Sequence, residues 1–102
     1  MSNQVAQIIL GQLGGNKFAV MTGAKNFASH GEENALSFRL SSTMTKNKCN
    51  RVKITLNGSD LYDVTFGKIF KMTFKEVSKF NDVYAEDLVN LFETETGLYT
   101  HL

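Results

Sequence analysis

Apolar residues follow helical spacing at the start of the chain. They recur every three or four positions over residues 5–13, at Val5, Ile8, Ile9 and Leu13. Ser2 or Asn3 is placed to cap this helix, and Gly14 with Gly15 supplies the positive φ angles that end it. Because a helix of about ten residues is marginal on its own, we expect it to dock on a sheet.

The middle of the chain switches to strict alternation, which is typical of strands with one wet face. Five runs alternate, with these inward positions: Phe18 and Val20; Leu36, Phe38 and Leu40; Val52, Ile54 and Leu56; Tyr62, Val64 and Phe66; Phe70, Met72 and Phe74. Asn57-Gly58 predicts a hairpin turn with two positive φ angles. Gly67-Lys68 predicts a second tight turn, and residues 41–50 form a longer basic loop.

Helical spacing returns near the end of the chain. Asp82 is a plausible N-cap, and the apolar stripe that follows comprises Tyr84, Leu88, Leu91 and Phe92. Gly97 stands where a left-handed C-terminal cap is expected. The segment Phe27–Gly31 carries no clear pattern and is interpreted as a loop.

These elements predict one α+β domain over residues 1–102: a curved, mainly antiparallel sheet of about five strands, with an N-terminal and a C-terminal helix on one face. The predicted core comprises Ile9, Leu13, Phe18, Val20, Leu36, Phe38, Val52, Ile54, Val64, Phe66, Phe70, Phe74, Leu88, Leu91 and Phe92.

Composition agrees with an ordinary globular domain, with 42% apolar and 21% charged residues. The single cysteine, Cys49, cannot form an internal disulfide and is interpreted as a loop residue without a role. The apolar runs are far shorter than a membrane span, and the first residues lack the basic start of a signal peptide. We therefore expect a cytoplasmic protein without membrane contact.

Charge is distributed unevenly, although the formal net charge is only +1. Residues 34–79 hold nine Lys or Arg against three acids, whereas residues 80–102 hold five acids and no Lys or Arg. Such asymmetry indicates something about partners rather than about the fold.

The basic strand positions form the leading candidate site, for nucleic acid or another polyanion. Its predicted residues are Lys17, Lys25, Asn26, Arg39, Arg51, Lys53, Lys71 and Lys75. The Gly23–Phe27 turn is a second place where backbone amides and a lysine can hold an anion. The alternative is that these cations are ordinary solvated residues that protect sheet edges. The strand aromatics are expected in the buried set, away from this face.

The rival hypothesis is a protein-binding inhibitor or accessory factor. It would engage a host protein through an exposed sheet edge or through the acidic C-terminal helix, with Glu86, Asp87, Glu93 and Glu95. An open sheet also has two unpaired edges, and Phe27, Phe80 and Tyr99 have no place in either apolar stripe. A homodimer is therefore expected.

Enzyme chemistry has little support. His30 and His101 are the only histidines, and neither has metal-ligand spacing with Cys49 or with the other. Glu32 and Glu33 beside His30 are interpreted as a solvated loop rather than an acid–base group. We predict no catalytic residue, no metal and no cofactor.

The chain also resembles a small family of proteins encoded by bacteriophages and prophages. The matching pieces are Leu13–Phe18, Met21–Phe27, Leu36–Phe38, Val52–Leu56, Asp60–Phe66, Val83–Leu88 and Thr96–Leu98. The resemblance carries no activity and no catalytic residues. It implies a phage-encoded protein that works in the cytoplasm of a bacterial host, where small proteins of this kind are more often binders than enzymes.

Overall fold

The computed structural model describes residues 4–30, 33–41, 45–46 and 48–98. The elements in chain order are α1 (Gln4–Leu13), α2 (Gly15–Thr22), β1 (Lys25–His30), β2 (Ala35–Arg39), β3 (Arg51–Leu56), β4 (Tyr62–Phe70), β5 (Thr73–Val83), the short 3-10 helix η2 (Ala85–Asp87) and α3 (Leu88–Thr96). Ser2, Asn3, Gly31, Glu32, Tyr99 and His101 lie outside the described residues. Within the described ranges, no helix has the length and apolar character needed to cross a membrane.

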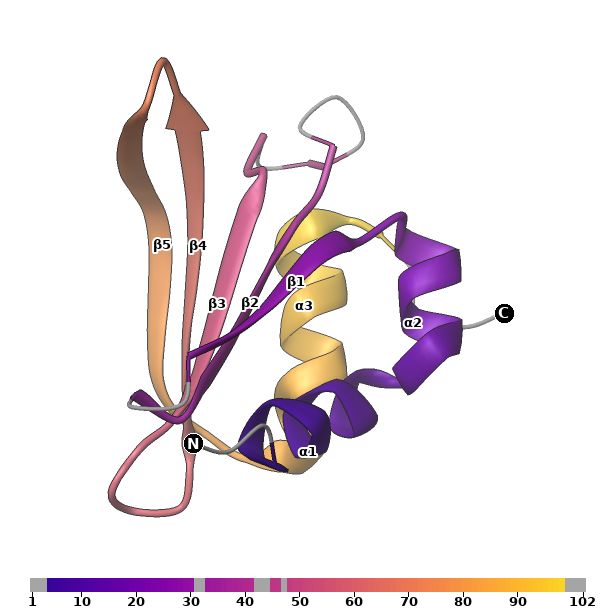
Figure 1. The fold of residues 1–102 in the computed structure, drawn as a ribbon, viewed down its shortest axis with the longest axis vertical. Coiled ribbons are helices and arrows are strands. Elements are labelled where there is room, and N and C mark those ends of the chain that lie inside the picture. The colour runs from indigo at the N-terminus through magenta and orange to yellow at the C-terminus, as the bar shows by residue number, and fades with distance from the viewer. Residues whose placement is uncertain (1–3, 31–32, 42–44, 47, 99–102) are drawn as a thin grey trace.

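The sheet is a five-stranded antiparallel meander in the order β1-β2-β3-β4-β5. Figure 1 shows α1, α2 and α3 together on one side of it. The predicted α+β architecture is confirmed, with one more helix than the sequence pattern predicts. Among the described residues, no helix lies on the opposite side of the sheet, which we call the open face.

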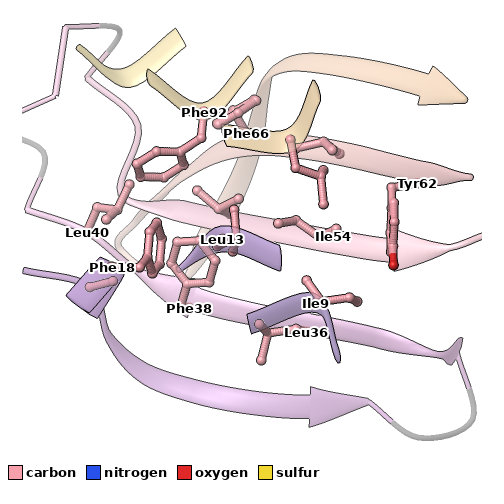
Figure 2. Packing of buried hydrophobic residues seen from close by; sticks show 14 of the residues in the cluster. Ile9, Leu13, Phe18, Leu36, Phe38, Leu40, Ile54, Tyr62, Phe66 and Phe92 are labelled. Carbon is pink, nitrogen blue, oxygen red and sulfur yellow. The ribbon is translucent and has the colours of Figure 1, made fainter. Parts of the chain in front are cut away.

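The core lies between the sheet and the three helices (Figure 2). Three fully buried rings from α2, β2 and α3 meet at its centre: Phe18 is 5.4 Å from Phe38 and 5.0 Å from Phe92, both in edge-on geometry. Such aromatic pairs favour this arrangement because the positive ring edge meets the negative ring face. Eleven of the fifteen predicted core residues are buried, and Leu91 packs partly buried against them.

Residues 18–21 are not a strand, as the alternation predicted, but part of α2. Phe18 and Thr22, one turn apart, face the core, and the Thr22 hydroxyl donates a hydrogen bond to the Phe18 carbonyl at 2.7 Å. Val20 is 78% exposed on the outer side, so its prediction as a core residue was wrong. Four residues are too few to distinguish alternation from helical spacing.

The segment interpreted as a loop after Phe27 is instead strand β1. Its residues are mostly exposed, and it pairs with β2 through Ala28–Ser37, Ser29–Leu36 and His30–Ala35. A polar edge strand has little hydrophobic pattern, because its place is fixed by backbone pairing with its neighbour. The sequence therefore gave no signal for it.

The turn between β4 and β5 lies at Lys71 and Met72, not at Gly67-Lys68 as predicted. Both turn residues have positive φ, 52° and 65°, although neither is glycine or asparagine. The strands continue past Gly67, and residues 68–75 form the tip of the hairpin, here called the β4–β5 arm. Figure 1 shows this arm projecting beyond the helices.

Phe70 and Phe74 lie on this arm and are 64% and 51% exposed, so their placement in the core was also wrong. The alternation in this segment was interpreted as a single strand, whereas Phe70 ends β4 and Phe74 lies near the start of β5, on the other side of the turn. The alternation did not indicate burial, because no helix reaches as far as the arm.

The hairpin between β3 and β4 is confirmed, but its turn has a different form. Asp60 has a positive φ of 61°, whereas Gly58 does not. The Asn57 side chain organises the loop, because its Oδ1 accepts hydrogen bonds from the backbone N–H groups of Ser59 and Leu61. This is the local side-chain turn that asparagine favours.

The C-terminal helix starts later than predicted. Asp82 belongs to β5, and α3 begins at Leu88 after the η2 turn. The predicted end is confirmed: Gly97 is left-handed, with φ 76°, and its N–H bonds the Glu93 carbonyl at 2.9 Å. Cys49 lies in the segment without regular structure just before β3, as predicted, and its side chain is buried in the core.

Candidate functional site

The strand register places the open face in rows that run across the sheet. The row nearest the β4–β5 arm is continuous over all five strands. It reads Lys25, Arg39, Arg51, Gly67 and Glu76, each directly opposite the next. Three predicted site residues, scattered over 27 positions of the sequence, thus come together as adjacent side chains.

We call Lys25, Arg39 and Arg51 the basic row. Neighbouring strands lie about 4.8 Å apart, and like charges directly opposite each other on a sheet are destabilising. No hydrogen bond or ion pair to these three side chains occurs within the described ranges. The three cations therefore lie side by side without an internal partner among the described residues.

Lys53 lies one row further from the arm, opposite Ser37 and Thr65. Its ammonium is paired with the Glu33 carboxylate. The hydrogen bond and charge of Lys53 hold the pKa of Glu33 below its ordinary value of 4.5, and His30 adds to this effect. Because it is already neutralised, Lys53 contributes less to an external anion site than the basic row.

His30 makes a specific contact that the sequence did not predict. Its Nε2 lies 2.8 Å from the Ser37 hydroxyl oxygen on the neighbouring strand. A serine and histidine in contact can form a nucleophile and base, but this pair lies on the open sheet face. We interpret it as a tie that holds edge strand β1 to β2. Within the described ranges, no cluster of three or more His, Cys, Asp and Glu side chains suits a metal ion.

The Gly23–Phe27 turn has less free hydrogen-bonding capacity than an anion site requires. Gly23 is the left-handed cap of α2, and its N–H bonds the Ala19 carbonyl at 3.0 Å. The Ala24 N–H bonds the Thr22 hydroxyl at 3.2 Å. These amides complete the end of the helix, so the turn contributes Lys25 to the site but no amide cradle. Asn26, with φ 57°, lies at the irregularity of β1.

The aromatic ring of Phe74 lies at the β4 end of the basic row. A Cβ added to Gly67 would collide with the Phe74 ring, so the ring covers this glycine on the open face. Gly67 is directly opposite Arg51, which places a half-exposed ring beside the last cation of the row. Phe74 was not predicted as a site residue, because its place in the alternating pattern indicated the core.

The other face of the β4–β5 arm carries a second basic surface. Lys68 is directly opposite Lys75, and Phe70 is opposite Thr73. With Lys71, these residues line an open groove of about 510 Å³. Lys75 therefore lies on the opposite side from the basic row, contrary to the predicted shared face. Lys17 belongs to α2, on the helix-bearing side of the sheet, and so is not part of the row either (Figure 1).

The acidic residues of the rival hypothesis do not form a single surface. Asp87 and Glu95 line a groove of about 640 Å³ between the end of β5 and α3, which we call the acidic groove. Glu95 accepts a hydrogen bond from the Ser78 hydroxyl at 3.1 Å. Glu86 is exposed on η2 and Glu93 is half-buried, and neither lines the groove. Asp82, which was predicted to be a helix cap, is the third acid that lines the groove.

Comparison of the chain with protein-family models, with curated proteins and with solved structures finds no match. The interpretation of the site therefore rests on its geometry and charge.

Proposed function

We propose that the protein binds nucleic acid through the open face of its sheet, with the basic row as the phosphate-binding element. The observation that carries this proposal is the alignment of Lys25, Arg39 and Arg51 on three adjacent strands, without internal partners in the described ranges. Guanidinium and ammonium groups contact phosphate oxygens in most protein–nucleic acid interfaces. With a strand spacing of about 4.8 Å, the row offers a cationic line about 10 Å long.

The neighbouring Phe74 ring supports single-stranded nucleic acid over duplex. Binding grooves for single strands combine cations that follow the backbone with aromatic side chains on which bases stack. Phe74 is 51% exposed beside Arg51, so a base has a flat apolar surface available next to the phosphate contacts. A duplex keeps its bases stacked internally and gains nothing from this ring.

Salt dependence tests the proposal directly. Fluorescence anisotropy with a labelled oligonucleotide of about 16 nucleotides, between about 50 and 200 mM salt, gives the slope of log K against log salt. Three phosphate contacts predict a slope of about −2 for a single strand and nearer −3 for a duplex. The Arg39→Gln/Arg51→Gln variant should make the slope on a single strand shallower by about 1.4.

A matched control removes the same charge elsewhere. The Lys17→Gln/Lys46→Gln variant changes two exposed cations of α2 and of the segment before β3, and its slope should equal that of the unmodified protein. The proposal fails if no oligonucleotide binds at the lowest salt, or if both double variants lose affinity equally. Equal loss would indicate general attraction to a basic protein rather than a site.

The host-protein hypothesis is the second candidate, and the acidic groove favours it because it joins an exposed edge strand to acidic side chains. A pull-down from bacterial lysate with and without nuclease separates the two. A stoichiometric protein partner that persists after nuclease, with no oligonucleotide binding, would favour the second candidate.

A further inference from the structure

Two surfaces outside the proposed nucleic-acid site have opposite charge and complementary character. One is the face of the β4–β5 arm that bears Lys68, Phe70 and Lys75; the other is the acidic groove beside α3. We propose that the arm of one molecule docks into the acidic groove of a second copy of the chain, giving head-to-tail assembly.

The arm presents three ammonium groups around one ring. Lys68 and Lys75 face each other across the hairpin, and the Lys71 ammonium lies 5.4 Å from the centre of the Phe70 ring. Within the described ranges, none of these lysines forms an ion pair. Glu76 follows Lys75 on the strand, but it belongs to the row on the open face and points away from this surface.

The acidic groove provides the counterpart. Asp82, Asp87 and Glu95 line it against a single cation, Lys79. Phe80, Val83 and Leu91 supply apolar lining, and Tyr84 stands 59% exposed at the same site. Its volume of about 640 Å³ is comparable to that of pockets that hold large ligands.

Exposed apolar residues gather on the arm as well. Phe70 is 64% exposed and Met72, at the tip, is 98% exposed. These two large apolar side chains, two positions apart at the tip, give the arm apolar surface that docking can cover. Docking covers it with apolar groove residues, while the lysines and acids pair around the contact.

An arm cannot reach the groove of its own molecule. Lys75 and Lys79 lie on the same strand, β5, and a strand advances about 3.3 Å per residue in a fixed direction. The arm points away from the groove along this axis, so the occupant is a second copy. Each head-to-tail contact leaves one arm and one groove unused, so the proposed assembly adds further copies as rings or chains instead of stopping at two.

Complementation between two variants tests the proposal. The arm variant, Lys68→Gln/Phe70→Ser/Lys75→Gln, removes the docking side chains. The groove variant, Asn90→Lys/Thr94→Lys, adds two cations on the exposed wall of α3. Light scattering should give a mass for the unmodified protein that grows past two copies with concentration and falls as salt is added.

Each variant alone should stay at 11.4 kDa, and an equimolar mixture should form a species of two copies and grow no further. In the mixture the groove variant supplies the only intact arm and the arm variant the only intact groove. The matched control, Val20→Ser/Lys46→Gln/Lys48→Gln, loses the same charge and one exposed apolar residue elsewhere and should assemble normally.

Circular dichroism melts establish that every variant is folded. An unmodified protein that stays monomeric at every accessible concentration overturns the proposal. So does a mixture that remains monomeric, or a dimer that neither variant disturbs. The measurements need no nucleic acid and leave Arg39 and Arg51 unchanged. Their outcome therefore does not depend on whether the protein binds nucleic acid.

Discussion

The ring of Phe74 lies directly over Gly67, on the neighbouring strand and on the open face of the sheet. Gly67 has an ordinary strand conformation, so its lack of a side chain serves the close approach of the ring and not a turn. The ring in turn shields backbone that a glycine leaves bare. This contact fixes Phe74 at the end of the basic row.

The Gly67→Ala variant should destabilise the protein by about 1–3 kcal/mol, the usual cost of overpacking a close contact. The new methyl group would meet the ring and also lie 3.1 Å from the Lys75 carbonyl oxygen. Chemical denaturation measures the change. Gly58→Ala is the matched control, because nothing lies within 4 Å of its added Cβ. A neutral or stabilising Gly67→Ala variant would show that the ring does not rest there.

Two phenylalanines that the sequence pattern treats alike should respond very differently to truncation. Phe38 is fully buried against Phe18 and Phe92, so Phe38→Ala should cost about 3–5 kcal/mol in the free energy of unfolding. Phe70→Ala, on the exposed arm, should cost less than about 1 kcal/mol. Urea titration of both variants checks this contrast. Equal costs would place Phe70 in the core.

The turn of the β4–β5 arm offers a stabilising change. Lys71 and Met72 both adopt left-handed backbone conformations, which cost about 1–2 kcal/mol for each residue other than glycine or asparagine. Asn-Gly is the sequence that such a two-residue hairpin turn favours. Lys71→Asn/Met72→Gly should therefore raise stability by about 1 kcal/mol and Tm by roughly 4–8 °C. A lower Tm in a thermal melt would contradict the turn geometry.

Long, regular patterns predicted most of the fold. Alternation over residues 36–40, 52–56 and 62–66 identifies three central strands, because each has one face on the core and one in water. The glycine at position 97 likewise marks the end of α3, since left-handed caps favour glycine. These signals are local, and the structure contains them as predicted.

The errors arose where tertiary packing decides the outcome. Helix α2 and a strand are equally compatible with the short run from Phe18 to Met21, and only docking against Phe38 and Phe92 selects the helix. Phe70 and Phe74 alternate like core residues, yet the arm extends beyond the helices that would cover them. Sequence alone does not say how far a covering layer reaches.

The candidate site was predicted by residue type but not by arrangement. Lys25, Arg39 and Arg51 were all named, but their alignment depends on the pairing of β1 with β2, and β1 was taken for a loop. Lys75 was assigned to the wrong side because the aromatic positions of its strand were taken to face the core, whereas Phe74 lies on the open face. A one-residue error in register is enough to exchange the faces of a strand.

The pair of Glu33 and Lys53 gives a prediction that depends on pH. The hydrogen bond and charge of Lys53 lower the pKa of Glu33 in the folded protein relative to the ordinary value of 4.5. A depressed carboxyl pKa contributes stability that is present above the unfolded value and is lost as the pH falls through the folded one. Because both side chains are substantially exposed, the contribution is small and sensitive to salt.

An NMR titration of the Glu33 side-chain carboxyl carbon should accordingly give a midpoint below 4.5. The Lys53→Gln variant should move this midpoint upward, because the largest stabilising influences on the charged carboxylate are removed. Lys46→Gln, which removes a cation not paired with Glu33, should leave it unchanged and serves as the control. High salt should shift the unmodified protein toward the variant. A Glu33 midpoint that ignores both the Lys53 substitution and the salt would show that the two side chains are not paired in solution.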